Sequence, residues 1–239
     1  MATQLTGAVQ VAAQGLFDES STALHVLGEL VHANDGRAFR YSRAGGTALV
    51  AGKLQQSSAE DTGTQNLTAV AASVGDTTIS ASTTVTITAN EYAGGLAIIT
   101  VTPGVGYAYR IKSHAAYTAA APTLTLGDSI KVALTTSSRI DLVRNPFDGV
   151  IVNPTTSTSS PVGVAVKPIT AAYYGWLQVA GIAAVLADGA NAVGATLVAS
   201  NAVAGAVEDA AAPNAQALVG LAHTGCADTE YGAVKLMLL

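Results

Sequence analysis

A β-hairpin is predicted most clearly by residues 24–45, where LHVLGELVHA (24–33) and RAFRYSRAG (37–45) flank Asn34-Asp35-Gly36. Glycine adopts a positive φ without steric cost, so this tripeptide between two apolar runs is a good turn signal. Valine, phenylalanine and tyrosine in the two runs suit a pleated, half-buried surface. The hairpin therefore favours a β structure for the part of the chain that surrounds it.

The segments that follow the hairpin also have strand patterns. TTISASTTVTIT (77–88) alternates threonine or serine with apolar residues, as a half-buried strand does. AIITVT (97–102) and YAYRIKSH (107–114) flank Gly104-Val105-Gly106, which predicts a strand, a turn and a strand. DSIKVALTT (128–136) fits either a strand or a short helix capped by Asp128.

Residues 162–239 form a run of short apolar segments separated by Gly, Asn, Asp or Pro. Strands with turn signals about every 8–12 residues are typical of a sandwich or barrel. No segment has the pattern of a long amphipathic helix. We therefore expect an all-β fold, made of short-stranded sandwich or barrel modules with an extended N-terminal arm.

The expected domain organisation has three parts. Residues 1–24 lack a clear period and predict the arm, residues 25–155 a β-rich body beginning with the hairpin, and residues 156–239 a compact C-terminal β-barrel or sandwich. The boundary rests on the loop TTSTSSP (155–161) and on a change in charge after it. The hairpin could pack into either module.

Composition excludes several classes of protein. Of 239 residues, 49% are hydrophobic and 11% are charged, against about 25% charged in typical soluble domains. A disordered chain needs the opposite balance, and a coiled coil needs more Glu, Lys and Arg. The lone Cys226 excludes an intrachain disulfide and a cysteine-based structural zinc site.

The most apolar stretch, WLQVAGIAAVLA (176–187), is shorter than the about 20 residues that a membrane-spanning helix needs. The first nineteen residues contain no Lys or Arg ahead of an apolar run, so they lack the pattern of a secretory leader. The expectation is a soluble protein made in the cytoplasm, with no membrane partner.

Charge is unevenly distributed along the chain. Residues 1–167 hold 10 basic and 11 acidic side chains, whereas residues 168–239 carry a net charge of −4 with Lys235 as their only base. Phosphate binding needs clustered Lys and Arg, so the C-terminal third is not expected to contact nucleic acid. Arg37, Arg40 and Arg43 are the nearest approach to a basic cluster, and salt bridges explain them better than a nucleic-acid site.

No catalytic motif is present: the chain lacks a P-loop, a dinucleotide-binding fingerprint and a G-x-S-x-G elbow. His25, Glu29 and His32 have metal-ligand spacing on a helix, but on a strand His32 points away from the other two. His223 and Cys226 are too close in sequence to suggest a Cys–His nucleophile. We expect no enzymatic activity, no cofactor and no metal.

The aromatic run Tyr173-Tyr174-Gly175-Trp176 contains the only tryptophan. Trp176 could anchor the core of the C-terminal module, the run could form a protein–protein contact, or it could stack on carbohydrate. On the predicted strand of the hairpin, Arg40 points to one face. The other face is shared by Arg37, Phe39, Tyr41 and Arg43. The candidate protein–protein contact is therefore Arg37, Phe39, Tyr41, Arg43, Tyr173, Tyr174 and Trp176.

Four segments resemble small structural proteins of tailed bacteriophages, and among these most closely the capsid decoration (cement) proteins. They are LGELVHANDGRAFRYSRAGGTALVAGKL (27–54), LTLGDSIKVALTTSSRIDLVRNPFDGVIV (124–152), VGVAVKPITAAYYGWLQVAGIAAVLADG (162–189) and VGLAHTGCADTEYGAVKLML (219–238). The resemblance implies a virion protein on the capsid exterior that binds the major capsid protein and reinforces the expanded shell. It also implies a homo-oligomer, with a trimer favoured, and an arm that orders on docking.

Two other classes stay open. Thr- and Gly-rich strands suit a tail or head-fibre protein equally well, whereas a major capsid protein would need a long spine helix that the sequence does not predict. A carbohydrate-binding or adhesin module would use exposed Tyr173, Tyr174 and Trp176, but their neighbours are mainly apolar, which favours burial.

Overall fold

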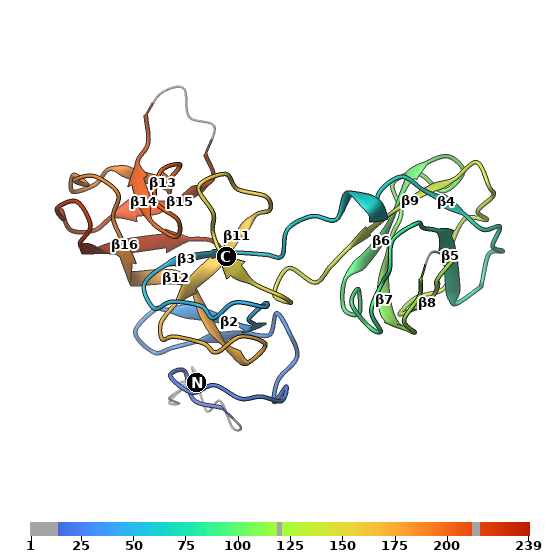
Figure 1. The fold of residues 1–239 in the computed structure, drawn as a ribbon, viewed down its shortest axis with the longest axis horizontal. Helices are drawn as coiled ribbons and strands as arrows, with labels where there is room; N and C mark the ends of the chain where they lie inside the picture. The colour runs from blue at the N-terminus through green and yellow to red at the C-terminus, as the bar shows by residue number, and fades with distance from the viewer. Residues whose placement is uncertain (1–13, 119–120, 212–215) are drawn as a thin grey trace, which may run out of the picture. The chain divides into compact units, whose positions relative to one another are not determined.

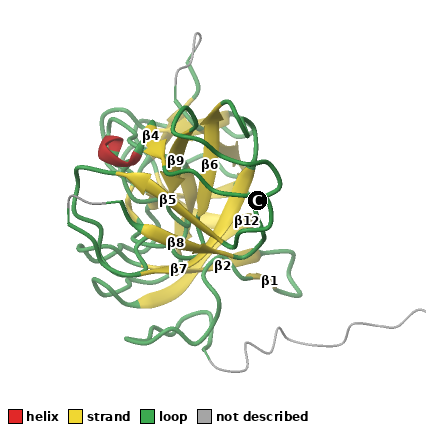
Figure 2. Cartoon of the chain, turned by 90° about the vertical axis from the view of Figure 1, so that its right-hand side faces the viewer, coloured by secondary structure: helices red, strands yellow, loops and turns green. Residues whose placement is uncertain are grey.

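A computed structural model describes residues 14–118, 121–211 and 216–239. The described chain is nearly all β, and Figure 2 shows how little of it is helical. It divides into two compact units. Unit 1 comprises Met1–Ala59 and Pro146–Leu239, and unit 2 comprises Glu60–Asn145. The described residues contain no helix that is long and apolar enough to cross a membrane.

Unit 1 is built on one antiparallel sheet whose strand order is β10-β3-β11-β12-β16-β15-β13-β14, with the hairpin β1-β2 joined to β12. Its strands are β1 (Leu30–His32), β2 (Ala38–Arg43), β3 (Leu54–Gln56), β10 (Ile151–Val152), β11 (Pro161–Ala165), β12 (Tyr174–Leu186), β13 (Thr196–Ala199), β14 (Val207–Asp209), β15 (Leu218–Ala222) and β16 (Tyr231–Met237).

The long strand β12 organises unit 1, because its two halves pair with different strands. The first half pairs with β2 and β11, and the second half with β16. Gly181 lies between the halves with φ +80°, a left-handed conformation that glycine adopts readily. A Cβ on this residue would lie 2.9 Å from the Gly36 carbonyl oxygen, so the close approach of the hairpin turn also requires glycine.

Unit 1 buries three apolar clusters. One lies under β12, β13, β15 and β16 and includes Val185, Leu197 and Val234. A second contains Leu49 and Leu177, and the third is aromatic and is described below. Inward side chains alternate with outward ones along β16, the period of two that a sheet with one covered face needs.

Unit 2 is a closed barrel with strand order β4-β5-β8-β7-β6-β9. Its interior is filled by alternate side chains such as Ile79, Ile99, Ile111 and Leu124, which are almost fully buried. A closed barrel has no unpaired edge strand. Its elements are the 3₁₀-helix η1 (Thr62–Thr64), β4 (Leu67–Ala69), β5 (Thr78–Ser82), β6 (Leu96–Val101), β7 (Ala108–His114), β8 (Thr123–Leu126) and β9 (Arg139–Val143).

Unit 2 is inserted into unit 1 between two paired strands. The chain leaves unit 1 after β3 and returns at β10, and these strands pair with Gln56 opposite Ile151 and Gln55 opposite Val152. Figure 1 shows both connecting segments running between the units. Because the points of exit and return are side by side, the insertion needs no rearrangement of unit 1.

The expected all-β class is confirmed, as are the hairpin over 24–45 and the turn at 104–106. DSIKVALTT forms no helix, and Leu134 bridges to Ala72. The expected division of the chain differs from the observed one: residues 25–59 and 146–155 belong with 156–239 in unit 1. The reason is long-range pairing of β2 and β3 with strands more than a hundred residues away. Residues 1–13 of the expected arm lie outside the described residues.

Candidate functional site

The predicted contact residues of the hairpin and of the aromatic run come together in unit 1. Strand β2 pairs with β12 so that Tyr41 lies opposite Trp176 and Arg43 opposite Tyr174. Directly opposed residues of antiparallel strands point to the same face with Cβ atoms about 5 Å apart. The prediction that Phe39, Tyr41 and Arg43 share a face is consistent with this register.

These residues form an aromatic cluster consisting of His25, Phe39, Tyr41, Tyr174 and Trp176. The Tyr41 ring centroid lies 5.0 Å from that of Trp176, edge to face, and 5.9 Å from that of Tyr174, stacked. The His25 ring lies 5.1 Å from both Tyr41 and Trp176. Phe39, Tyr41 and Trp176 are completely buried, so they hold the core of this end of unit 1 and do not face a partner.

The aromatic cluster fastens an N-terminal strap, residues 14–30, across unit 1. Buried Gln14 is its first anchor. Its side-chain oxygen accepts a hydrogen bond from the Tyr41 hydroxyl (2.8 Å), its Nε2 donates to the Tyr174 carbonyl (3.0 Å), and its own carbonyl accepts from Trp176 Nε1 (3.3 Å). The polar groups of both aromatic side chains are thereby satisfied inside the core, as buried tyrosine and tryptophan require.

The Tyr41 hydroxyl has a second role, because it also accepts a hydrogen bond from the Leu24 amide at 3.2 Å. Burial raises the pKa of Tyr41 above its ordinary value, since a phenolate would lose its hydration there. The side chain is therefore held as a neutral phenol. In this form it donates to Gln14 and accepts from Leu24, which lie ten residues apart in the strap.

Further bonds attach the middle of the strap to the segment before β12. Ser20 and Tyr174 exchange backbone hydrogen bonds of 3.1 and 2.8 Å. The Glu19 carboxylate accepts from the Thr170 amide (2.7 Å) and hydroxyl (3.1 Å) and lies 3.9 Å from Lys167 Nζ. The strap is thus fixed at several points without forming a helix. The only helical element in the described chain is η1 of unit 2.

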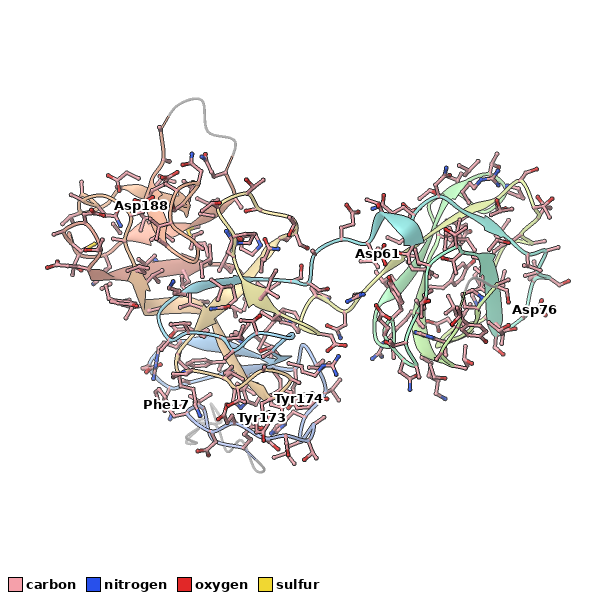
Figure 3. The ribbon with its side chains drawn as sticks, viewed as in Figure 1. Phe17, Asp61, Asp76, Tyr173, Tyr174 and Asp188 are labelled. Atoms are coloured by element: carbon pink, nitrogen blue, oxygen red, sulfur yellow. The ribbon has the colours of Figure 1, made fainter. Side chains whose placement is uncertain are left out.

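The strap exposes large apolar side chains beside the polar residues Asp18, Ser21, Thr22 and Glu29. Phe17 is 61% exposed, Val26 is 64% exposed, and Leu24 and Leu30 are also exposed. We call these four side chains the strap surface. Exposed Tyr173 lies at the same end of unit 1, as the labels Phe17, Tyr173 and Tyr174 in Figure 3 show. Large apolar side chains gathered on a fastened segment are typical of a contact surface.

His25 and Glu29 lie together, with Nδ1 to Oε2 at 3.3 Å, whereas His32 is exposed on β1. His25 Nε2 is buried and has no hydrogen-bond partner among the described residues. Within the ranges that the structure describes, no group of three His, Cys, Asp or Glu side chains is arranged to hold a metal ion. The metal-ligand spacing read from the sequence therefore brings only two of its three residues together.

The three arginines of the hairpin have partners within unit 1. Arg37 Nε donates to Asp35 at 2.7 Å, and Arg40 donates to the Gly28 carbonyl at 2.8 Å. Arg43 is paired with Asp148. Burial disfavours the charge on Arg43, but the Asp148 carboxylate outweighs this effect, so the pKa of Arg43 is raised. The salt-bridge interpretation is confirmed for Arg37 and Arg43.

The other candidate residues have local roles. Cys226 lies in the connection between β15 and β16, and its backbone bridges to Asn191. Asp18 accepts a hydrogen bond from the Gly15 amide, and Asp61 caps η1 by accepting from the Gly63 amide. Capping is the role expected for the paired acids, and the structure shows it for these two.

The sequence pattern did not single out Gln14. The segment around Gln14 has no hydrophobic periodicity, so its sequence does not indicate which residues are buried. The available signal was chemical: a buried tyrosine and tryptophan each need a hydrogen-bond partner, and the nearest polar side chain outside the strands could have been considered.

Comparison of the chain with protein-family models, with curated proteins and with solved structures finds no match in any of the three. The function is therefore argued from the residues and the fold.

Proposed function

We propose that this protein is a non-catalytic structural component of a virion, which binds the outer surface of an icosahedral phage capsid and stabilises the shell. The proposed partner is the major capsid protein, contacted through the strap surface. Sequence phrases that resemble those of capsid decoration proteins support the class. The apolar strap surface supports the mode of binding.

The main support for the proposal is that the strap is fixed to the core on one side and exposes four large apolar side chains on the other. Gln14 and Ser20 fix its backbone to Tyr41, Tyr174 and Trp176. Phe17, Val26 and their neighbours are left exposed to water. A surface that is ordered before binding loses less conformational entropy on association than a disordered one. Many copies on one shell would add avidity to a modest contact.

Charge agrees with a protein partner. Acidic residues outnumber basic ones in the chain, and the three arginines nearest the strap are engaged with Asp35, Gly28 and Asp148. Nucleic-acid binding needs free clustered cations. We therefore propose neither nucleic acid nor membrane as a partner, and a location on the capsid exterior.

The test is co-sedimentation of the purified protein with empty capsids that lack it, before and after expansion. The proposal expects saturating binding to expanded shells and a raised melting temperature of the shell. Val26→Asp should weaken binding because it buries a charge in the contact. The matched control is Val74→Asp, which changes an equally exposed valine in a turn of unit 2.

Absence of binding to either shell would overturn the proposal and would favour the alternatives of a tail or head-fibre component. Equal loss with Val26→Asp and Val74→Asp would overturn the role of the strap surface. A glycan-binding alternative is weakened by the complete burial of Trp176 and the stacking of Tyr174 on Tyr41. Tyr173 alone of the aromatic run is exposed.

A further inference from the structure

The outer face of β12 and β16 lacks the polar side chains that normally cover a sheet. Cross-strand partners on this face are Ala180 with Met237, Ile182 with Lys235, Ala184 with Ala233, and Leu186 with Tyr231. Leu221 of β15 continues the row beyond Lys235. Ile182 is 47%, Tyr231 52% and Met237 55% exposed. We call these residues the sheet face of unit 1.

Lys235 is the only charged residue of the sheet face. An antiparallel sheet with one face toward water usually alternates apolar inward residues with polar outward ones. Here β16 alternates correctly between buried and exposed positions, but most of the exposed positions are also apolar. The pattern is that of a sheet covered on both sides.

A groove of about 580 Å³ continues the sheet face toward the strap. Exposed Phe17 and Val50 line it together with Ile182, Ala184 and Tyr231. The groove extends the apolar surface, and Arg37 and Gln178 also line it. Half of a large apolar side chain is roughly 100 Å², so five such side chains outside the strap surface expose on the order of 500 Å². They are Val50, Ile182, Leu221, Tyr231 and Met237.

We propose that the sheet face of unit 1 is buried against the same face of a second copy of this chain, in a dimer and not in the trimer that the sequence resemblance implies. The exposed apolar area matches the apolar part, somewhat over half, of the roughly 800 Å² that each partner contributes to a standard interface. Sheets that pack face to face lie about 10 Å apart and interdigitate apolar side chains. A second copy supplies a sheet of matching shape and chemistry.

The charge of Lys235 determines where the two-fold axis of the proposed dimer can pass. A two-fold axis through Lys235 would bring two ammonium groups together, which is unfavourable. An axis through Ala233, with the two β16 strands antiparallel, places each Lys235 opposite Tyr231 of the second copy. The ammonium group then lies over an aromatic ring, while small Ala184 and Ala233 allow close approach at the axis.

Sedimentation velocity of the full-length protein, over a wide range of concentration, tests this interface. The expected mass is about 48 kDa, twice the 23.8 kDa of one chain. Ile182→Asp should weaken association at least about tenfold by placing an unpaired carboxylate in the interface. Lys235→Glu should also weaken it, because a carboxylate would replace the ammonium group over the negative face of the Tyr231 ring. Both residues are exposed, so neither change should disturb folding.

Val74→Asp is the control, and its mass should equal that of the wild type. A monomeric wild type, a trimer of about 71 kDa, or a dimer unaffected by Ile182→Asp would each overturn the inference. None of these measurements uses capsids, so their failure is distinguishable from failure of the proposed function.

Discussion

The outer surfaces of units 1 and 2 differ in the polarity of their cross-strand neighbours. In unit 2 the apolar outward residues of β6 have charged neighbours: Leu96 lies opposite Arg110, and Ile98 lies opposite Asp141. In unit 1 most outward residues of β12 lie opposite Ala, Tyr or Met, and Ile182 alone has a charged partner in Lys235. The barrel is closed and its exposed apolar residues, such as Leu96 and Val143, are interspersed with charged ones, whereas unit 1 has an open sheet with an apolar face. We infer that unit 1 makes the contacts with other chains.

The largest expected effect is the unfolding of one unit without the other. Trp176→Ala should destabilise unit 1 by about 3–5 kcal/mol, because it removes the largest fully buried side chain. Unit 2 has its own core, so its unfolding should be unchanged. Differential scanning calorimetry should show one transition moving to lower temperature.

Ile111→Ala is the reciprocal variant, since Ile111 is fully buried in the barrel. It should lower the other transition. If either substitution lowered both transitions together, the two units would not be independent.

The bend of β12 gives a second comparison, this time within unit 1. Gly181→Ala should cost about 2–3 kcal/mol, because a positive φ and a contact with the Gly36 oxygen both oppose a Cβ. Gly36→Ala should cost about 1–2 kcal/mol, because its φ is also positive but no atom lies near the added Cβ. Urea denaturation measures both, and equal costs would contradict the close approach at Gly181.

The attachment of the strap can be weakened without removing an aromatic ring. Tyr41→Phe leaves the Gln14 side-chain oxygen and the Leu24 amide without their hydroxyl partner, at a cost of about 1–3 kcal/mol. Trp176 is the only tryptophan and donates to the Gln14 carbonyl, so its fluorescence reports on the strap. The emission should shift to longer wavelength as the strap loosens.

Tyr107→Phe provides the control, because Tyr107 is an exposed tyrosine of unit 2. It should change neither stability nor emission. An unchanged Trp176 spectrum in Tyr41→Phe would show that the hydroxyl does not hold the strap.

The smallest expected effect is a pH dependence at the hairpin turn. The Arg37 backbone amide, and then its guanidinium, hold the pKa of Asp35 below its ordinary 3.8. The folded state therefore binds the proton less readily than the unfolded state. The contribution to stability is present above pH 3.8 and is lost as the pH falls through the lower, folded pKa.

Asp35→Asn should therefore lower the melting temperature of unit 1 slightly at neutral pH and leave it unchanged in strong acid. Calorimetry of both proteins across this range measures the difference. A difference that did not vary with pH would show that the carboxylate charge contributes nothing.

Local patterns predicted local structure well. The turn at Asn34-Asp35-Gly36 and the alternation in TTISASTTVTIT are properties of a few neighbouring residues. The first produced the expected hairpin, and the second a strand over Thr78–Ser82, the first part of the predicted segment. The domain boundary at 155 failed because β2 and β3 find their partners in β12 and β11, far along the chain. Nothing in the hairpin itself specifies which distant strand it joins.

The candidate site was predicted in part. The seven residues chosen from aromatic and basic runs do lie around one cluster, but three of them are buried. Burial depends on what packs above a strand face, and here that is the strap. Gln14 and Phe17 lie in a segment without hydrophobic periodicity. The sequence pattern therefore could not predict that Gln14 is buried and Phe17 is exposed.

Cryo-electron microscopy of expanded capsids saturated with the protein tests the proposed capsid contact directly. We expect density on the outside of the shell in which unit 1 makes the contact, with Phe17 and Val26 of the strap surface facing the major capsid protein. Density with unit 2 against the shell and the strap surface facing solvent would contradict it, as would shells that carry no added density.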